Sequence, residues 1–329
     1  MVNVNDCLEK MRSADKDLRY MSVSDLITAL EKDSVKLDPS SSKRLVEQLL
    51  KLLNDNSNDV QEVAARCLGP LVRTVSDGLV LDIANCLVEH LLSTDKKADE
   101  LRDISALALK TVLAQLAPDA PATAKMVDAI VPKLMQSVSA AGDAPPQQEL
   151  YRLEALQDVV ERFGALLVAH HAKLQDVLLP FITATRAGSR KRAIGTLASL
   201  SVSASDAQFN ALIAHVVGTI KGAKKAHVVR SLIQCIAIVS RSVGHRLGKQ
   251  LGELVPLVVA NCDSPAFESD DELRENCFIC FETLVVRCPN EIAPHLDDIV
   301  KLSLKYIKHD PNYAVDDDDA AAADDAALD

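Results

Sequence analysis

Apolar side chains recur along much of the chain with the spacing of one face of an α-helix. In the segment 57–72, SNDVQEVAARCLGPLV, they fall at steps of three and four residues, at Val60, Val63, Ala64, Cys67, Leu68, Leu71 and Val72. This is the 3.6-residue period of an amphipathic helix that buries one face. The segment therefore predicts a helix that packs against neighbouring helices.

The same pattern returns at nearly regular intervals. Similar segments begin at residue 15 (DKDLRYMSVSDLITAL), residue 98 (ADELRDISALALKTVL) and residue 270 (DDELRENCFICFETLV). The intervals are 42, 41, 49, 39, 40 and 44 residues when these positions are taken as equivalent: Leu18, Val60, Leu101, Leu150, Ser189, Val229 and Leu273. A second set of apolar helical segments lies between them, so each repeat is a pair of helices, A and B. This period is typical of HEAT and armadillo repeats. The sequence therefore predicts an all-α fold, a HEAT-type α-solenoid that forms a superhelix of about seven and a half helical-hairpin repeats.

The predicted solenoid occupies residues 1–312. The segment 139–148, SAAGDAPPQQ, accounts for the longest interval, and its Gly and Pro residues indicate a surface loop. Residues 313–329 are rich in Asp and Ala, which predicts a disordered acidic tail. The eighth A helix thus has no B helix after it, and solenoid ends need a polar cap or a partner. We expect another polypeptide, such as a separate carboxy-terminal half of the same protein, to cover its apolar face at Leu296, Ile299, Val300, Leu302 and Ile307.

Composition and charge exclude several classes of protein. No uninterrupted apolar run approaches the roughly 18 residues of a membrane span, and the amino terminus is charged, so we expect a chain that is neither secreted nor membrane-inserted. The eight cysteines are scattered through apolar helical stretches, which favours free thiols and a cytoplasmic and nuclear location. Seven of the negative charges behind the net charge of -11 lie in the last fourteen residues, which leaves -4 on the rest. This balance argues against general nucleic-acid binding.

No pattern in the sequence supports catalysis or a cofactor. Cys277 and Cys280 have the CxxC spacing of zinc and redox sites, but three residues apart on a helix they fit core positions better, and four converging ligands are not evident. The segment GHRLGKQ at 244–250 resembles a phosphate-binding loop, but it is one residue short, ends in Gln and follows no strand. We therefore expect no enzyme activity, no metal and no cofactor.

Basic residues gather at two equivalent turns between A and B helices. Stacking of the repeats would place them on one basic ridge, formed by Arg190, Lys191, Arg192, Lys224, Lys225 and Arg230, with Arg186 and Lys221 beside them. Two interpretations stay open at this point. The ridge is either a solvated loop edge or a strip that binds an acidic segment of a partner or the chain's own aspartate tail.

Several segments resemble one family more closely than a generic repeat does. These are SADKDLRYMSVSDLI from residue 13, CLGPLV from residue 67, LRDISALALKTV from residue 101, IAIVSRSVGHRLG from residue 236, DDELRENCFICFETLVVRCP from residue 270 and DPNY from residue 310. They are similar to the amino-terminal HEAT repeats of the cullin-associated, neddylation-dissociated family. The likeness runs from about Cys7 to Asp319 and includes irregular turns.

The resemblance implies a regulator of cullin-RING ubiquitin ligases that promotes exchange of substrate-receptor modules. In that family the amino-terminal repeats hold the carboxy-terminal region of an unmodified cullin with its RING subunit, and later repeats, absent here, displace the adaptor. The resemblance thus implies half of a split protein or a truncated product. Exposed B-helix residues would meet the cullin, and the candidates are Lys16, Arg19, Tyr20, Gln61, Arg66, Arg102, Lys110, Arg152 and Arg274. Each of them is also compatible with a solvated helix surface.

Two other functions share this architecture. An importin-like or other protein-binding scaffold is the first, because fold does not dictate function. The second is a phosphatase-type scaffold subunit, which would predict uniform repeats near 39 residues. The irregular turns count against the first, and the insertion and acidic tail against the second.

Overall fold

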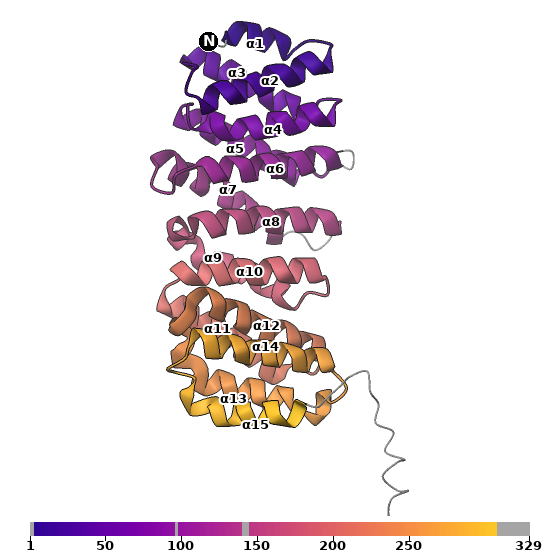
Figure 1. The fold of residues 1–329 in the computed structure, drawn as a ribbon, viewed down its shortest axis with the longest axis vertical. Coiled ribbons are helices and arrows are strands. Elements are labelled where there is room, and N and C mark those ends of the chain that lie inside the picture. Colours follow the sequence, from indigo (N-terminus) through magenta and orange to yellow (C-terminus); the bar gives the residue numbers. More distant parts are fainter. Residues whose placement is uncertain (1–2, 96–97, 140–144, 308–329) are drawn as a thin grey trace, which may run out of the picture. The chain divides into compact units, whose positions relative to one another are not determined.

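The structure is a computed structural model that describes residues 3–95, 98–139 and 145–307. Within these ranges it contains fifteen α-helices, five short 3-10 helices and no strand, so the predicted all-α solenoid is confirmed. The chain divides into two compact units, Met1–Leu212 and Ile213–Asp329. Each unit is a stack of helical hairpins (Figure 1).

The first unit is built in two layers of helices. The B layer contains α2 (Lys16–Glu31), α4 (Asn58–Val72), α6 (Asp99–Gln115), α8 (Pro146–Phe163) and α10 (Ala187–Ser203). The A layer contains α1 (Val4–Lys10), α3 (Pro39–Leu52), α5 (Asp77–Leu92), α7 (Pro121–Ser139) and α9 (His171–Leu178), the last flanked by the 3-10 helices η2 (Gly164–His170) and η3 (Leu179–Thr183). Consecutive helices pack side by side within each layer (Figure 1).

The second unit continues the same plan. Helix α11 (Asp206–Gly222) begins before the boundary, and α12 (Ala226–Val243), η4 (Gly244–Gln250), α13 (Leu251–Cys262), η5 (Pro265–Phe267), α14 (Asp271–Arg287), η6 (Ala293–His295) and α15 (Leu296–Tyr306) follow. The B helices α12 and α14 pack together, and α13 packs against α14 and α15. Helix α15 is the eighth A helix of the prediction.

Side-chain caps set where several helices begin. The Asp38 carboxylate accepts hydrogen bonds from the backbone amides of Ser40 and Ser41 at 2.9 and 3.0 Å, and Pro39 takes the first helical position of α3. Asp270 caps α14 in the same way through the amide of Leu273 at 2.8 Å. These carboxylates occupy the amides that a helix start leaves unpaired, which stabilises a helix by about 1 kcal/mol each.

The core consists of aliphatic side chains between the layers. Leu26, Leu49, Leu68, Leu87 and Leu109 are all almost completely buried. Burying one such side chain stabilises the fold by roughly 1.5–3 kcal/mol. The apolar face predicted for 57–72 is therefore the face that α4 buries.

One stretch in the described residues, Ala226–Cys262, is long and apolar enough to cross a membrane by length and hydropathy alone. It is not one helix, because η4 separates α12 from α13. Half of its most apolar window is buried inside the protein. Its hydropathy is accounted for by the core of the second unit.

Two predicted segments, the surface loop and the acidic tail, lie partly or wholly outside the described residues. Residues 140–144 of the predicted surface loop and all of the predicted acidic tail at 313–329 are in this group. The repeat register also needs one change. Arg152 of α8 makes the same kind of backbone contact as Arg19 and Arg102 make in their repeats. The residue before it, Tyr151, is therefore the equivalent of Leu18, and Leu150 is not.

Gly69 marks the closest approach of α4 and α6. A Cβ atom at this position would lie 2.7 Å from Cγ2 of Thr111, whose hydroxyl donates a hydrogen bond to the Leu107 carbonyl at 2.8 Å and so holds the side chain in place. We expect Gly69→Ala to destabilise the protein by about 1–3 kcal/mol, as overpacking of a filled core does. Urea unfolding followed by circular dichroism measures this effect.

Gly218 supplies the matched control. It is exposed within α11, and nothing lies within 4 Å of an added Cβ. Gly218→Ala should stabilise the protein by up to about 1 kcal/mol through helix propensity. Equal effects of the two substitutions would show that the α4–α6 contact is not tight.

Candidate partner-binding surface

One polar side chain near the start of most B helices reaches back to the loop before it. The Arg19 guanidinium donates to the carbonyls of Ser13 and Ala14 at 2.9 and 3.0 Å. Arg102 donates to those of Ser93 and Asp95, both at 2.8 Å. The remaining members of this set, which we name the loop clamps, are Gln61, Arg190 and Arg274, which donate to loop carbonyls, and Arg152, which donates to the carbonyl of Ser137 in the last turn of α7. Helical side chains lean toward the amino terminus of their helix, which brings these donors to the loop carbonyls.

The loop clamps correct part of the predicted binding site. Gln61, Arg102, Arg152 and Arg274 are buried, and Arg102 is 0% exposed. The expectation that these four are exposed contacts is wrong, because their donors turn inward and bind backbone carbonyls that precede their own helix. Burial also lowers the pKa of Arg152, with the positive charge of Arg102 as a lesser cause.

The other five predicted contact residues lie in the B layer of the first unit. Lys16, Tyr20, Arg66 and Lys110 are exposed on α2, α4 and α6. Arg19 is half-buried, since its guanidinium pairs with Asp55 at 2.7 Å. These positions are accessible to a partner, and their role in binding stays a prediction.

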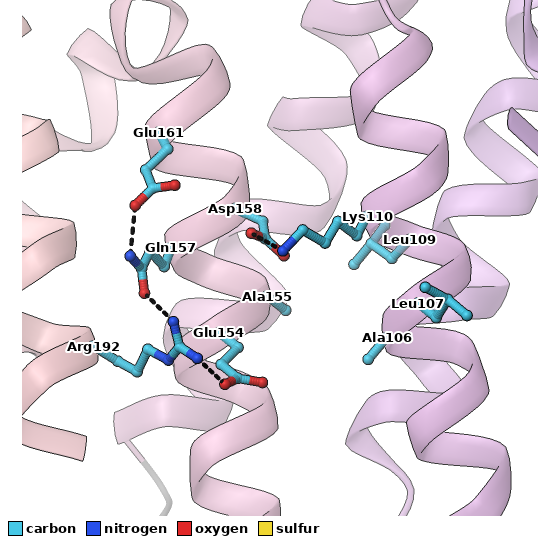
Figure 2. Close-up of a pocket in the computed structure, with 10 residues that line it drawn as sticks. All are labelled: Ala106, Leu107, Leu109, Lys110, Glu154, Ala155, Gln157, Asp158, Glu161 and Arg192. Carbon is cyan, nitrogen blue, oxygen red and sulfur yellow. Dashed lines mark hydrogen bonds and ion pairs between the residues drawn. The ribbon is translucent and has the colours of Figure 1, made fainter. Parts of the chain in front are cut away.

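A groove of about 290 Å³ runs between α6 and α8 on the same layer. Figure 2 shows Lys110 of α6 reaching across it to Asp158 of α8, with the nitrogen 3.9 Å from the carboxylate oxygen. Along its α8 side a chain of polar contacts joins Arg192 to Gln157 at 3.5 Å and Gln157 to Glu161 at 2.5 Å, while Arg192 also pairs with Glu154 (Figure 2). The lining residues are Ala106, Leu107, Leu109, Lys110, Glu154, Ala155, Gln157, Asp158, Glu161 and Arg192.

A second groove of about 310 Å³ lies between α4 and α6. It is lined by Asn58, Gln61, Glu62, Glu100, Asp103, Ile104 and Leu107. Leu107 borders both grooves and is 40% exposed, so an apolar side chain lies between two grooves that are lined mostly by polar residues.

Charge in the two grooves is mainly negative. Six carboxylates line them, against the two cations Lys110 and Arg192. Burial raises the pKa of Asp158, and the nearby Lys110 opposes that shift. The B layer of the first unit therefore combines an exposed apolar side chain with a surplus of carboxylates, which suits a protein surface that carries basic groups.

Four of the eight residues on and beside the predicted basic ridge pair with carboxylates. In the first unit Arg186 pairs with Glu149 at 3.0 Å, Arg192 pairs with Glu154, and Arg190 is a loop clamp. In the second unit Lys221 pairs with Glu253 at 2.7 Å, and Arg230 pairs with Glu272 and Asp270. Lys191, Lys224 and Lys225 are exposed. Because the two sets belong to different units, one continuous ridge stays a prediction.

Helix α15 carries an exposed apolar stripe. Leu296, Val300, Leu304 and Ile307 are 38, 51, 64 and 73% exposed, and their spacing places them on one side of the helix. The predicted docking set is therefore wrong at two positions. Ile299 and Leu302 are 7 and 6% exposed because they pack inward, and Leu304, which was not predicted, belongs to the stripe.

The CxxC cysteines lie in the core of the second unit. Cys277 and Cys280 are completely buried in α14. Among the residues that the structure describes, no three His, Cys, Asp or Glu side chains are grouped as they would be around a metal ion.

Comparison with known proteins identifies the relatives of this chain. A HEAT repeat profile matches residues 45–75, which include the turn from α3 into α4. The chain is 38% identical over 311 residues to cullin-associated NEDD8-dissociated protein 1 of Dictyostelium discoideum, and 40% identical over 322 residues to protein 2 of that name in Mus musculus. These matches cover 94% and 96% of the chain. The chain is similar to one part of the cullin-associated NEDD8-dissociated proteins.

The homology covers only part of those proteins. The chain spans about a quarter of the length of the Dictyostelium and mouse relatives, 25% of each. A relative from Emericella nidulans is similar in extent: it is named the N-terminal part of cullin-associated NEDD8-dissociated protein 1, is 29% identical, and is covered to 88% of its length. The predicted resemblance to the amino-terminal HEAT repeats of this family is confirmed.

Solved structures agree on the fold. The karyopherin Kap121p bound to Pho4p superimposes with a TM-score of 0.59 over 93% of this chain and 32% of that chain, at 14% identity. At this identity the likeness shows a shared helical solenoid and nothing about function.

Proposed function

We propose that this chain is a non-catalytic scaffold that binds the carboxy-terminal region of an unmodified cullin together with its RING subunit. Homology over nearly the whole chain to proteins named for their association with cullins carries this proposal. In this proposal the cullin contacts the B layer of the first unit, where Leu107 stands between two grooves rich in carboxylates. Binding to a large surface of this kind needs complementary shape and charge and no chemical step.

The proposal extends to the assembly of cullin-RING ligases. With a carboxy-terminal half, the chain would regulate exchange of substrate receptors, in the cytoplasm and nucleus. The free cysteines support a reducing location. A transport role of the importin kind has only the likeness of fold in its favour.

A second partner would dock on the apolar stripe of α15. We propose that a helical hairpin from a separate carboxy-terminal half covers Leu296, Val300, Leu304 and Ile307, as one hairpin of this solenoid covers the next. The exposure of these side chains and the existence of a relative named as an N-terminal part support this partner. Apolar helix faces of this size are normally covered by another element.

Calorimetric titration tests the main proposal. The purified chain is titrated with an unmodified cullin carboxy-terminal region in complex with its RING subunit, and then with the same complex carrying the ubiquitin-like modifier. Saturable binding to the first that is lost with the second is expected. Absence of binding to the unmodified complex, both by the chain alone and with the carboxy-terminal half added, would contradict the proposal.

Leu107 gives a sharper test of where the cullin binds. We expect Leu107→Glu to weaken cullin binding about tenfold or more, because it removes apolar contact area and adds a negative charge that must lose water. The same titration measures the change. Val168→Glu is the matched control, since Val168 is 64% exposed on η2, outside the B layer. Equal effects of the two substitutions would place the contact elsewhere.

A further inference from the structure

A cysteine and a histidine meet in the A layer of the first unit. Cys86 and His90 are four residues apart on α5, so both lie on the same side of the helix. The Cys86 sulfur lies 3.6 Å from Nε2 of His90. The other ring nitrogen of His90, Nδ1, lies 3.1 Å from the hydroxyl oxygen of Ser105 on α6. One ring nitrogen is thus held by a neighbouring helix, and the other faces a thiol.

This pair of side chains is accessible from solution. Cys86 and His90 are both partly exposed, whereas the other seven cysteines, all within the described residues, are buried. Ser105 is completely buried, so it contacts the imidazole ring from the inside of the protein. An ion in solution can therefore reach the sulfur and the free ring nitrogen, while Ser105 keeps the ring in position.

The separation of the two atoms suits tetrahedral metal coordination. Zinc binds thiolate sulfur at about 2.3 Å and imidazole nitrogen at about 2.0–2.1 Å, and a tetrahedral angle between such bonds sets sulfur and nitrogen about 3.6 Å apart. Cys86 and His90 already have this separation. A soft ion that holds two ligands in a line, such as Cu(I), would need them further apart. In the metal-free chain the same distance is that of a hydrogen bond between thiol and ring, so zinc binding would need little rearrangement.

Charge around the pair is also compatible with a divalent cation. Burial lowers the pKa of His90, so the ring is neutral at pH 7 and can offer a lone pair. Burial raises the pKa of the Cys86 thiol, and the negative charge of Glu89 acts in the same direction, so the thiol has to lose its proton when it binds a metal. The carboxylate of Glu89 attracts a dication, and Lys133, which pairs with Glu89 at 3.5 Å, offsets part of that attraction.

We propose that Cys86 and His90 bind one zinc ion, with water in its remaining positions. The Cys86 thiolate and Nε2 of His90 are the two protein ligands, and the thiol proton passes to solvent on binding. Nδ1 keeps its proton and donates it to Ser105, the kind of outer contact that orients a zinc-bound histidine. Because the described residues contain no group of three such ligands, we expect an exchangeable ion and not a structural zinc that the fold requires. The inference does not rest on the proposed function, since it uses no cullin and no second chain.

Titration with cobalt tests the site, because Co²⁺ can replace Zn²⁺ and absorbs light when it is bound to a thiolate. The reduced full chain is titrated with Co²⁺, and the thiolate-to-cobalt absorption band is followed. We expect one Co²⁺ per chain, which Zn²⁺ displaces. Cys86→Ser should abolish the band, and His90→Ala should weaken binding about tenfold or more. No band in the original chain, or an undiminished band in Cys86→Ser, would overturn the inference.

Alkylation gives a second measurement that needs no substitution. Zinc should slow the reaction of Cys86 with iodoacetamide about tenfold or more, because the bound thiolate no longer attacks freely, and peptide mapping by mass spectrometry assigns the effect to Cys86. His215→Ala is the matched control for His90→Ala, since His215 is exposed on α11, and circular dichroism checks that each variant is folded. Alkylation of Cys86 that zinc does not slow, or equal loss of the zinc effect in both histidine variants, would count against the site.

Discussion

Replacing Arg102 with alanine is expected to destabilise the protein by about 3–5 kcal/mol. The side chain is completely buried, and its guanidinium satisfies the carbonyls of Ser93 and Asp95 at 2.8 Å. Removal leaves two loop carbonyls without a donor and a cavity in place of the arginine stem. The pair with Asp99 adds little, since that carboxylate is 70% exposed. A large fall in the urea midpoint, measured by circular dichroism, is the expected result.

Arg66 is the matched control for Arg102. It is exposed on α4, in the same layer, and was predicted from sequence to have the same role. Arg66→Ala should change the stability by no more than about 0.5 kcal/mol, as surface substitutions usually do. An Arg102→Ala chain with unchanged stability but weaker cullin binding would instead make Arg102 a contact residue, and the loop-clamp interpretation would be wrong.

Replacing Leu304 with glutamate is expected to weaken binding of the carboxy-terminal half about a hundredfold. Leu304 is 64% exposed on the stripe of α15, and burial of a leucine in an interface stabilises it by roughly 1.5–3 kcal/mol. The substitution removes that contribution and requires a carboxylate to be buried without a partner. Titration of the chain with the carboxy-terminal half measures the loss, and the free chain should keep its stability because Leu304 packs against little in it.

Asp298 gives the control on the same helix. It is exposed, and at 100° per residue it lies on a different side of α15 from the stripe. Asp298→Lys should therefore leave the affinity nearly unchanged. If both variants bind as tightly as the original chain, the stripe is not the docking surface. If both lose binding, the loss is not specific to the apolar stripe.

The helices and the repeat pattern of the chain could largely be predicted from the sequence. The apolar period of α4 and the repeat interval depend on residues close in sequence, and the structure confirms the helices that they indicate. Irregular segments around residues 236–248 and 270–289 were specific enough to indicate the family, because such turns differ from one repeat protein to another. These features are set by helix propensity and by the pairing of backbone groups near each residue.

The role of individual polar side chains depended on tertiary structure. From the sequence, Arg66 and Arg102 were both predicted to be exposed helix charges, but only Arg102 donates hydrogen bonds to loop carbonyls. The direction of a side chain and the position of the loop before its helix decide this difference. The prediction was wrong at Ile299 and Leu302 for the same reason. The apolar residues of α15 cover a wide part of the helix surface, and the sequence alone does not show which of them pack against the previous hairpin.

The sequence by itself therefore determined that this protein is a stack of helical hairpins related to cullin-associated proteins. Tertiary structure decided which surfaces are available for binding: the grooves on either side of Leu107 and the stripe on α15. Each of these joins residues from two helices or depends on what a neighbouring helix leaves uncovered. These features depend on how the repeats pack against one another, and this packing cannot be read from the sequence of a single repeat.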